Sequence, residues 1–182
     1  MCLSERRQSF SQLVKELKSD IRNPMYEGSF ARKLFLVPGF KYTFHHRICF
    51  YMRGVWWLRP LCFLHLIYLS HLRIKYGIEM SSRFHIPERL SIAHFGGIVF
   101  YPESCGKNVL VRQGVTVGNN GKSMKGPSIG NNVSFGAHSM ALGDITIGDN
   151  TVIAAGAVVT KDVPSGAIVA GVPAKVISRS GL

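Results

Sequence analysis

The second half of the chain repeats with a period of six residues. An aliphatic or small apolar residue opens each hexad, and a small or β-branched residue fills the fifth position. A fixed period of this kind indicates a repeat architecture in which each unit stacks on its neighbours. The opening positions are Ile129, Phe135, Ala141, Ile147, Ile153 and Val159, with a fainter continuation upstream through Ile78, Phe84, Leu90, Val99, Cys105, Val111 and Val117.

A unit of six residues has a simple physical interpretation. A short strand followed by a tight turn points one apolar side chain inward, and three such units close a triangular coil of about eighteen residues. Glycine and asparagine at the corners supply positive φ at little steric cost. We therefore predict a mainly β protein whose fold is the left-handed parallel β-helix. The handedness comes from known proteins with this repeat, because the spacing alone does not show it.

Composition and charge divide the chain of 182 residues into two parts. Eighteen of the nineteen aromatic residues lie at or before Tyr101, and fifteen of the nineteen glycines lie after Leu90. Residues 1–75 hold thirteen Lys and Arg against four Asp and Glu, which is +9 of the net charge of +12. We predict a helical N-terminal region over 1–75, a β-helix domain over 76–178 with a projecting loop at 119–128, and a tail at 179–182.

The N-terminal region shows helical patterns over 11–21, 42–52 and 61–75, with breaks at Pro24 and Pro38. Its apolar run is too short and too charged at its flanks to span a membrane. Two interpretations stay open. The helices pack against each other or a partner subunit, or a basic segment lies on the inner membrane face with Trp56 and Trp57 at the headgroups.

The remaining composition narrows the partners and the compartment. The basic region contains no recognisable nucleic-acid-binding motif, so no nucleic-acid partner is expected. The four cysteines form no CxxC pair and the N-terminus carries no signal peptide, which favours the cytoplasm. His85, His94 and His138 lack the spacing of zinc-dependent hexapeptide hydratases, so no metal is expected. The cysteines are Cys2, Cys49, Cys62 and Cys105.

Four motifs in order resemble the serine acetyltransferase branch of the hexapeptide acyltransferases. They are Y-G-I-E-M from Tyr76, I-A-H-F-G-G-I-V from Ile92, V-T-V-G-N-N-G-K from Val115 and V-A-G-V-P-A-K from Val169. The resemblance covers roughly residues 76–178. The N-terminal region also looks similar to the O-acetyltransferases of capsule and exopolysaccharide synthesis, through K-Y-T-F-H-H-R-I at Lys41.

The resemblance implies a catalytic pair. His94 matches the family's general base, and Glu79 falls where the family has the acidic residue that orients it. Fifteen residues separate the two, three short of one coil, and nine residues instead of six separate Leu90 from Val99. We expect this irregular corner to project His94, which would take the proton of an acceptor hydroxyl as its oxygen attacks a thioester.

The resemblance also implies the donor and its site. Acetyl-CoA lies in the groove between subunits of a homotrimer in this family, and each site takes residues from two subunits. The matching positions here are Gly118, Asn119, Ala137, Ala155 and Lys175. The interval from Val117 to Ile129 is twelve residues instead of six, so a loop projects there. Lys122 and Lys125 in this loop either meet an acidic sugar or a CoA phosphate, or are simply solvated.

Departures from the family pattern bear on the acceptor. Ala93 replaces the family's acidic residue before the histidine, and Lys125 and Gly126 replace its Arg-His pair, which together hold the charged groups of serine. Loss of such contacts disfavours a small zwitterion. We therefore predict acetylation of a sugar hydroxyl in polysaccharide biosynthesis. The alternatives are serine O-acetylation for cysteine biosynthesis, N-acetylation of an amino sugar, and a non-catalytic β-helix scaffold or membrane-docking module.

Overall fold

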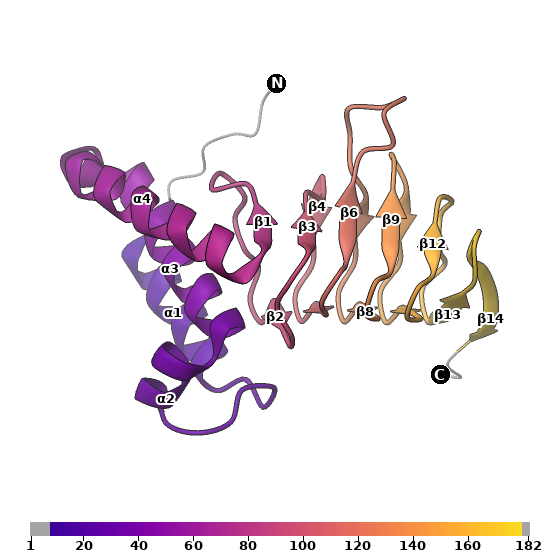
Figure 1. Cartoon of the computed structure of the whole chain (residues 1–182), viewed down its shortest axis with the longest axis horizontal. Helices are drawn as coiled ribbons and strands as arrows, with labels where there is room; N and C mark the ends of the chain where they lie inside the picture. Colours follow the sequence, from indigo (N-terminus) through magenta and orange to yellow (C-terminus); the bar gives the residue numbers. More distant parts are fainter. Residues whose placement is uncertain (1–7, 180–182) are drawn as a thin grey trace.

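A computed structural model describes residues 8–179, so Cys2 and the end of the predicted tail, residues 180–182, lie outside the described part. Helices gather at one end of the molecule, and a prism of short strands extends away from them (Figure 1). The predicted class, a mainly β left-handed parallel β-helix with a helical N-terminal region, is confirmed. The predicted boundary at residues 75–76 falls inside the last turn of a helix, and the division into domains stays a prediction.

The helical end begins with two helices capped by serines. The Ser9 hydroxyl accepts a hydrogen bond from the backbone N–H of Gln12, and the Ser29 hydroxyl accepts one from Arg32, which satisfies donors that the first turn leaves free. The predicted break at Pro38 lies within one residue of a boundary between two helices, because one helix ends at Leu36 and the next starts at Pro38, where proline suits the first turn. The helices are α1 (Phe10–Ile21), α2 (Phe30–Leu36), α3 (Pro38–Gly54), the 3-10 helix η1 (Trp56–Leu58) and α4 (Arg59–Tyr76).

In residues 8–179 the strands form three sheets, one for each face of the prism. Pairing is parallel throughout, except where β13 and β14 close the C-terminal end as an antiparallel pair. The first face contains β1 (Ile78–Met80), β3 (Ile98–Phe100), β6 (Thr116–Gly118), β9 (Met140–Leu142) and β12 (Val158–Val159). The second contains β2 (Ser91–Ile92), β5 (Leu110–Val111), β8 (Ser134–Phe135), β11 (Val152–Ile153), β13 (Ala167–Ala170) and β14 (Lys175–Arg179). The third contains β4 (Ser104–Cys105), β7 (Ser128–Ile129) and β10 (Thr146–Ile147).

The core of the prism follows the period of six in the C-terminal coils. Ile147 and Ile153 are fully buried, as are the other residues that open hexads there to within a few per cent. The period fails at Val99, which faces outward while its neighbours Ile98 and Phe100 are buried. Side chains along a strand alternate between its two faces. The additional residues upstream of Val99 therefore place Ile98 and Phe100, and not Val99, in the inward-facing positions.

The helical end covers the first coil, which would otherwise expose unpaired strand groups. The Tyr26 hydroxyl accepts a 2.8 Å hydrogen bond from the N–H of Ile92 in β2. A Cβ on Gly39 of α3 would lie 2.2 Å from the Ile92 carbonyl oxygen, so only glycine permits this contact. The N-terminal helices therefore act as a cap for the β-helix.

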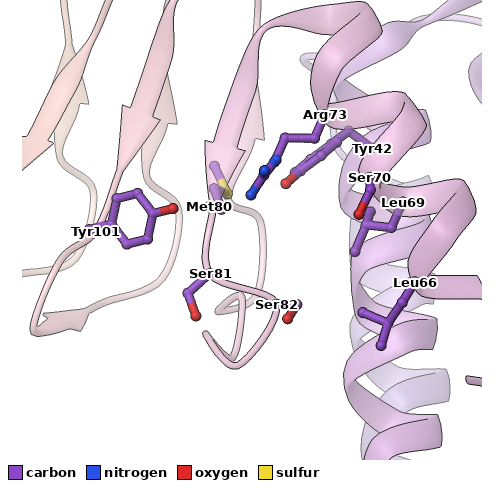
Figure 2. A pocket seen from close by; sticks show the side chains of 9 residues that line it. All are labelled: Tyr42, Leu66, Leu69, Ser70, Arg73, Met80, Ser81, Ser82 and Tyr101. Carbon is purple, nitrogen blue, oxygen red and sulfur yellow. The ribbon is translucent and has the colours of Figure 1, made fainter. Parts of the chain in front are cut away.

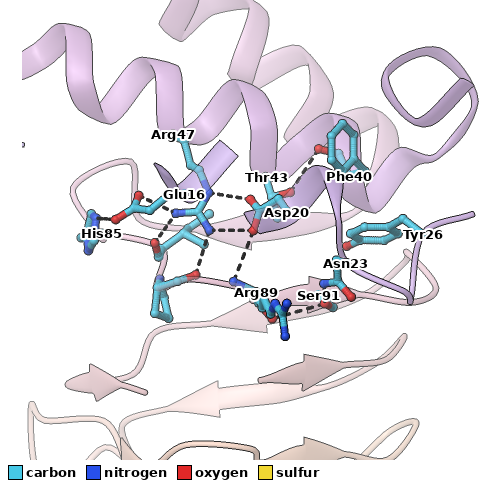
Figure 3. A network of polar contacts seen from close by, with 12 residues as sticks. Glu16, Asp20, Asn23, Tyr26, Phe40, Thr43, Arg47, His85, Arg89 and Ser91 are labelled. Atoms are coloured by element: carbon cyan, nitrogen blue, oxygen red, sulfur yellow. Dashed lines mark hydrogen bonds and ion pairs between the residues drawn. The ribbon is translucent and has the colours of Figure 1, made fainter. Parts of the chain in front are cut away.

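A buried network of charges joins the same two parts (Figure 3). Arg47 of α3 donates to Asp20 at 2.7 Å and to Glu16 at 2.9 Å, both on α1. It also donates to the carbonyl oxygens of Ile86 and Pro87, in the segment before β2. All of the guanidinium's partners are thus supplied by two distant stretches of chain, which is the condition under which a buried charge is tolerated.

Candidate functional site

The corner between β2 and β3 carries His94. The chain takes eight residues from Ile92 to Phe100 here, whereas the next coil takes six from Val111 to Val117. The two additional residues open this corner, and His94 is exposed on it. Within the described residues its ring makes no hydrogen bond. An exposed imidazole with both nitrogens available can accept a proton from a bound molecule and return it.

The start of β1 packs directly against this corner. Gly77 has a φ of 59°, and a Cβ there would lie 3.0 Å from the backbone nitrogen of Gly97 and 3.4 Å from Gly96. The rings of Tyr76 and Phe95 also meet, with centroids 5.4 Å apart. The end of α4 and the His94 corner are therefore held together by close backbone and ring contacts.

Glu79 lies in the middle of β1, opposite Val99 of β3, and is exposed. The Tyr101 hydroxyl donates a 3.0 Å hydrogen bond to its Oε1 atom. Burial and this bond to the Glu79 carboxylate raise the pKa of Tyr101, so the hydroxyl keeps the proton that it donates. No hydrogen bond joins Glu79 to His94 within residues 8–179. The orienting role of Glu79 thus stays a prediction.

Two of the predicted donor-site residues lie along the same edge of the prism as His94. Backbone hydrogen bonds connect successive coils along this edge. The N–H of Gly114 donates to the carbonyl oxygen of Gly96 at 2.8 Å, and the N–H of Gly156 donates to the carbonyl oxygen of Ala137 at 2.9 Å. The predicted Ala155 precedes Gly156. Small residues let a ligand approach the backbone closely here.

The other predicted donor-site residues lie elsewhere. Gly118 ends β6 on the first face, opposite Leu142, and has open space where a Cβ would be. Asn119 follows it at the start of the projecting loop, where its side chain accepts from the N–H of Gly121 at 3.1 Å. Lys175 is exposed at the start of β14, on the second face. Their part in donor binding stays a prediction.

The projecting loop extends from the prism between β6 and β7 (Figure 1). Lys122 is exposed near its tip, where its N–H bonds to the Asn120 side chain at 3.0 Å. Lys125 forms an ion pair with Asp144, at 3.7 Å between Nζ and Oδ2. Both partners of this pair are more than half exposed, so solvent weakens it. Lys125 therefore has a protein partner in Asp144. The predicted contacts of Lys122 and Lys125 with an acidic sugar or a CoA phosphate stay predictions.

An open pocket of about 290 Å³ lies between α4 and the first coils. Figure 2 shows Arg73 and Tyr42 from the helices and Tyr101 from the β-helix pointing toward the same space beside Met80. Reasoning from the sequence missed Arg73 and Tyr101 as site residues. The sequence did offer one indication of Arg73, because it lies one helical turn before the motif that contains Glu79.

Residues 8–179 contain neither a candidate metal site nor a candidate membrane span. No group of three or more His, Cys, Asp or Glu side chains could hold a metal ion in this range. No described helix is long and apolar enough to cross a membrane. The expected absence of a metal stays a prediction.

Comparisons with known proteins identify the family. A family described as bacterial transferase hexapeptide (six repeats) matches residues 126–161. The serine acetyltransferase of Synechococcus elongatus is 35% identical over 178 residues, which cover 93% of this chain and 71% of that enzyme. The chain belongs to the serine acetyltransferase family. The enzyme of Mycobacterium tuberculosis is 33% identical over 150 residues, and this chain covers 64% of its length.

Solved structures agree with this membership. The serine acetyltransferase of Neisseria gonorrhoeae in complex with serine has a TM-score of 0.75 and 29% identity, over 93% of this chain and 71% of that one. The Brucella abortus enzyme in complex with coenzyme A has a TM-score of 0.75 and 30% identity, over 94% of this chain and 70% of that one. The predicted acyltransferase class is confirmed, and the predicted donor, acetyl-CoA, agrees with the Brucella complex.

The prediction of a sugar acceptor in polysaccharide biosynthesis is wrong. Serine acetyltransferases match this chain along nearly its whole length, and one of the similar solved structures contains serine. The prediction rested on three positions, Ala93, Lys125 and Gly126, each compared singly with the family pattern. A charged group can be bound by a different residue that reaches the same space from elsewhere in the fold, and position-by-position comparison does not register it.

Proposed function

We propose that this protein transfers an acetyl group from acetyl-CoA to the hydroxyl oxygen of L-serine. The observation that carries the proposal is the match to a serine acetyltransferase over 93% of this chain and 71% of that enzyme. The structural likeness to a relative in complex with serine supports the same acceptor. The products are O-acetyl-L-serine and free coenzyme A, as in the first step of cysteine biosynthesis.

His94 acts as the general base in this proposal. A ring nitrogen takes the proton of the serine hydroxyl while the oxygen attacks the thioester carbonyl. The tetrahedral adduct collapses, the C–S bond breaks, and the imidazolium returns the proton to the departing sulfur. Glu79 stabilises the imidazolium from β1. The transfer is direct, within a complex of both substrates, and forms no covalent intermediate on the enzyme.

Acetyl-CoA binds along the edge of the prism that holds His94. The small residues Ala137 and Ala155 allow the pantetheine arm to run close to backbone N–H groups there. In this proposal Gly118 and Asn119, at the end of β6, form the other side of the groove from a neighbouring copy of the chain, and Lys175 meets the phosphates. The exposed lysine of the projecting loop, Lys122, offers a second cation to the donor or the acceptor, whereas Lys125 is paired with Asp144.

Release of the coenzyme A thiol from acetyl-CoA tests the proposal. The purified protein is expected to release thiol in proportion to added L-serine, and to release little without it. O-methyl-L-serine is the matched control, because its oxygen carries no proton for His94 to remove. The absence of serine-dependent release would contradict the proposal.

We infer that the protein works as a homotrimer in the cytoplasm. The resemblance to the family implies three copies that pack side by side, so that each groove is shared by the edges of two copies. Light scattering coupled to size-exclusion chromatography measures the mass directly. A mass of three chains is expected, and a monomer that is active at assay concentration would contradict the inference.

A surface of η1 and α4 favours peripheral contact with an anionic membrane. Trp56 and Trp57 are 74% and 63% exposed, and four large apolar residues of α4 next to them are each more than half exposed. Residues 28–78 contain eight Lys and Arg and no Asp or Glu. The apolar residues of α4 in this patch are Leu61, Phe63, Leu64 and Ile67.

The charge of this segment favours lipid over a second copy of the chain. Two copies meeting through the patch would bring two segments of net positive charge together, whereas anionic headgroups neutralise such charge. Aromatic side chains at the headgroup level add apolar burial.

Flotation with vesicles tests the membrane contact. The protein is expected to float with phosphatidylglycerol vesicles and not with phosphatidylcholine vesicles. A Trp56→Ser, Trp57→Ser variant should lose flotation, and Ile177→Ser, which changes an exposed apolar residue on β14, should not. The absence of flotation, or a loss of assembly size in the tryptophan variant without any lipid binding, would contradict this inference.

A further inference from the structure

The pocket between α4 and the first coils contains a cation without a partner. Arg73 is exposed, and its side chain makes no ion pair or hydrogen bond within residues 8–179. By contrast, the buried Arg47 has all of its hydrogen bonds satisfied by protein groups. A guanidinium held in a pocket with its donors unused is suited to bind a carboxylate through two parallel hydrogen bonds.

The other side chains around Arg73 also suit an anion. Ser70 lies one helical turn earlier on the same face of α4, and Ser81 and Ser82 line the pocket from the segment after β1. Their hydroxyls can each donate a hydrogen bond. Tyr42 lies at the helical side of the pocket (Figure 2), where burial raises its pKa, so it stays uncharged beside Arg73.

A charge of opposite sign lies beside the pocket, on Glu79. The Tyr101 hydroxyl, which lines the pocket, donates to Oε1 of Glu79, and Oε2 makes no hydrogen bond within the described residues. One guanidinium and one carboxylate close together complement a molecule that carries one carboxylate and one ammonium. A phosphate with two negative charges would be opposed by Glu79. Both charges act on Tyr101 at the edge of the pocket, so together they match a zwitterionic amino acid.

Arg73 also lies next to the corner of His94 through the backbone. The N–H of Gly77 caps α4 by bonding to the carbonyl oxygens of Arg73 and Ile74. Gly77 in turn packs against Gly96 and Gly97, two and three residues after His94. The backbone of Arg73 is therefore linked through Gly77 to the corner that carries the general base.

We propose that Arg73 binds the carboxylate of the amino-acid acceptor and so determines specificity for serine. This inference rests on the proposed function and names a residue that carries it out. It also explains how the chain accepts serine although Ala93, Lys125 and Gly126 lack the family's charged contacts. The helical end then has a second role beyond capping the β-helix, because α4 supplies part of the acceptor site.

Steady-state kinetics with two acceptors tests this role. L-Serinamide keeps the hydroxyl and the amine of L-serine and replaces the carboxylate with an uncharged amide. The Arg73→Gln variant is expected to raise KM for L-serine about tenfold or more, which corresponds to loss of a charged hydrogen bond. KM for L-serinamide and for acetyl-CoA should change little, so the preference for serine over serinamide should collapse.

Two control variants separate this role from general effects of charge. Lys75→Gln removes a positive charge from the same helical turn outside the pocket, and should leave the preference unchanged. Arg73→Lys keeps the charge without the planar pair of donors, and should give an intermediate preference. Thermal melting of each variant checks that the fold is retained.

The outcomes distinguish this inference from the proposed function. Wild-type protein that acetylates serine, with an unchanged serine preference in Arg73→Gln, would overturn the role of Arg73 alone. A rise in KM for acetyl-CoA instead of serine would assign the guanidinium to the donor's phosphates and would also overturn it. Wild-type protein that acetylates neither acceptor would overturn the proposed function, and this inference with it.

Discussion

At the scale of single residues, His94 carries the proposed chemistry, and its exposed ring makes no hydrogen bond or ion pair within residues 8–179. Replacement with alanine therefore removes the base without breaking a polar contact among these residues. The His94→Ala variant is therefore expected to lower kcat by about 10²–10⁴-fold, with an unchanged melting temperature. His71→Ala, at an exposed histidine of α4, is the control. An unchanged kcat in His94→Ala would remove this residue from the reaction.

Single residues also show why the site was only partly predictable. His94 and Glu79 lie inside short motifs, so their residue types and spacing were visible in the sequence. Arg73 and Tyr101 lie twenty-eight positions apart, and only the folding of α4 onto the first coil brings them to one pocket. The wrong acceptor followed from reading Ala93 and Lys125 without that pocket.

At the scale of elements, the docking of α1 and α3 depends on the buried Arg47. Burial would raise the pKa of Glu16, but hydrogen bonds from His85 and Gln12 and the charge of Arg47 lower it, so Glu16 stays ionised. Arg47→Met would leave two buried carboxylates, Glu16 and Asp20, without their cation. We expect this to lower the free energy of unfolding by about 3–5 kcal/mol.

Chemical denaturation measures this effect against a matched control. Lys15→Met breaks an ion pair with Glu88 at 3.0 Å whose lysine is 65% exposed. Because solvent screens such a pair, the expected loss is at most about 1 kcal/mol. Equal losses in the two variants would contradict a special role for the buried network.

The same elements mark the limit of prediction from sequence. The helical patterns placed α1, α3 and α4 approximately, because helical periodicity is local. Pro38 marked the boundary between α2 and α3 correctly to within one residue, whereas the packing of Gly39 on Ile92 was not visible in the sequence. The Arg47 network joins residues up to 40 positions apart, which no local pattern reveals.

At the scale of the whole molecule, acid should destabilise the fold through buried histidines. His46 is fully buried, and burial lowers its pKa to about 4. Burial and the neighbouring His65 and Lys41 likewise lower the pKa of His45 to about 4. Above about pH 6.5 these groups are neutral in both states. Between 6.5 and 4 the unfolded chain binds protons that the folded chain does not, so stability falls as pH falls.

Denaturation curves from pH 7 to pH 4 check this dependence. The contribution of His46 is on the order of 3 kcal/mol at the acidic end. His46→Gln cannot titrate but can still donate to the Ser81 carbonyl, which His46 contacts at 3.0 Å, and should flatten the curve. His71→Gln should not. A wild-type stability that is constant across this range would show that the histidines titrate normally.

The regular part of the molecule was predictable because the period of six imposes the same inward position on every coil. Ile147 and Ile153 obey it without exception. The corner that was predicted to be irregular is the one that carries His94. The two additional residues lie between Ile92 and Phe100, and not between Leu90 and Ile92. The number of copies that assemble and the partner of the apolar patch on η1 and α4 could not be predicted in this way, because the surfaces involved do not follow the period of six.

Identification of the product tests the central claim most directly. The protein is incubated with L-serine and acetyl-CoA that carries carbon-13 in its acetyl group, and the acceptor is analysed by mass spectrometry and NMR. We expect labelled O-acetyl-L-serine to form with wild-type protein and to be lost with His94→Ala. Wild-type protein that consumes no acetyl-CoA in the presence of serine, or that leaves serine unlabelled, would contradict the account.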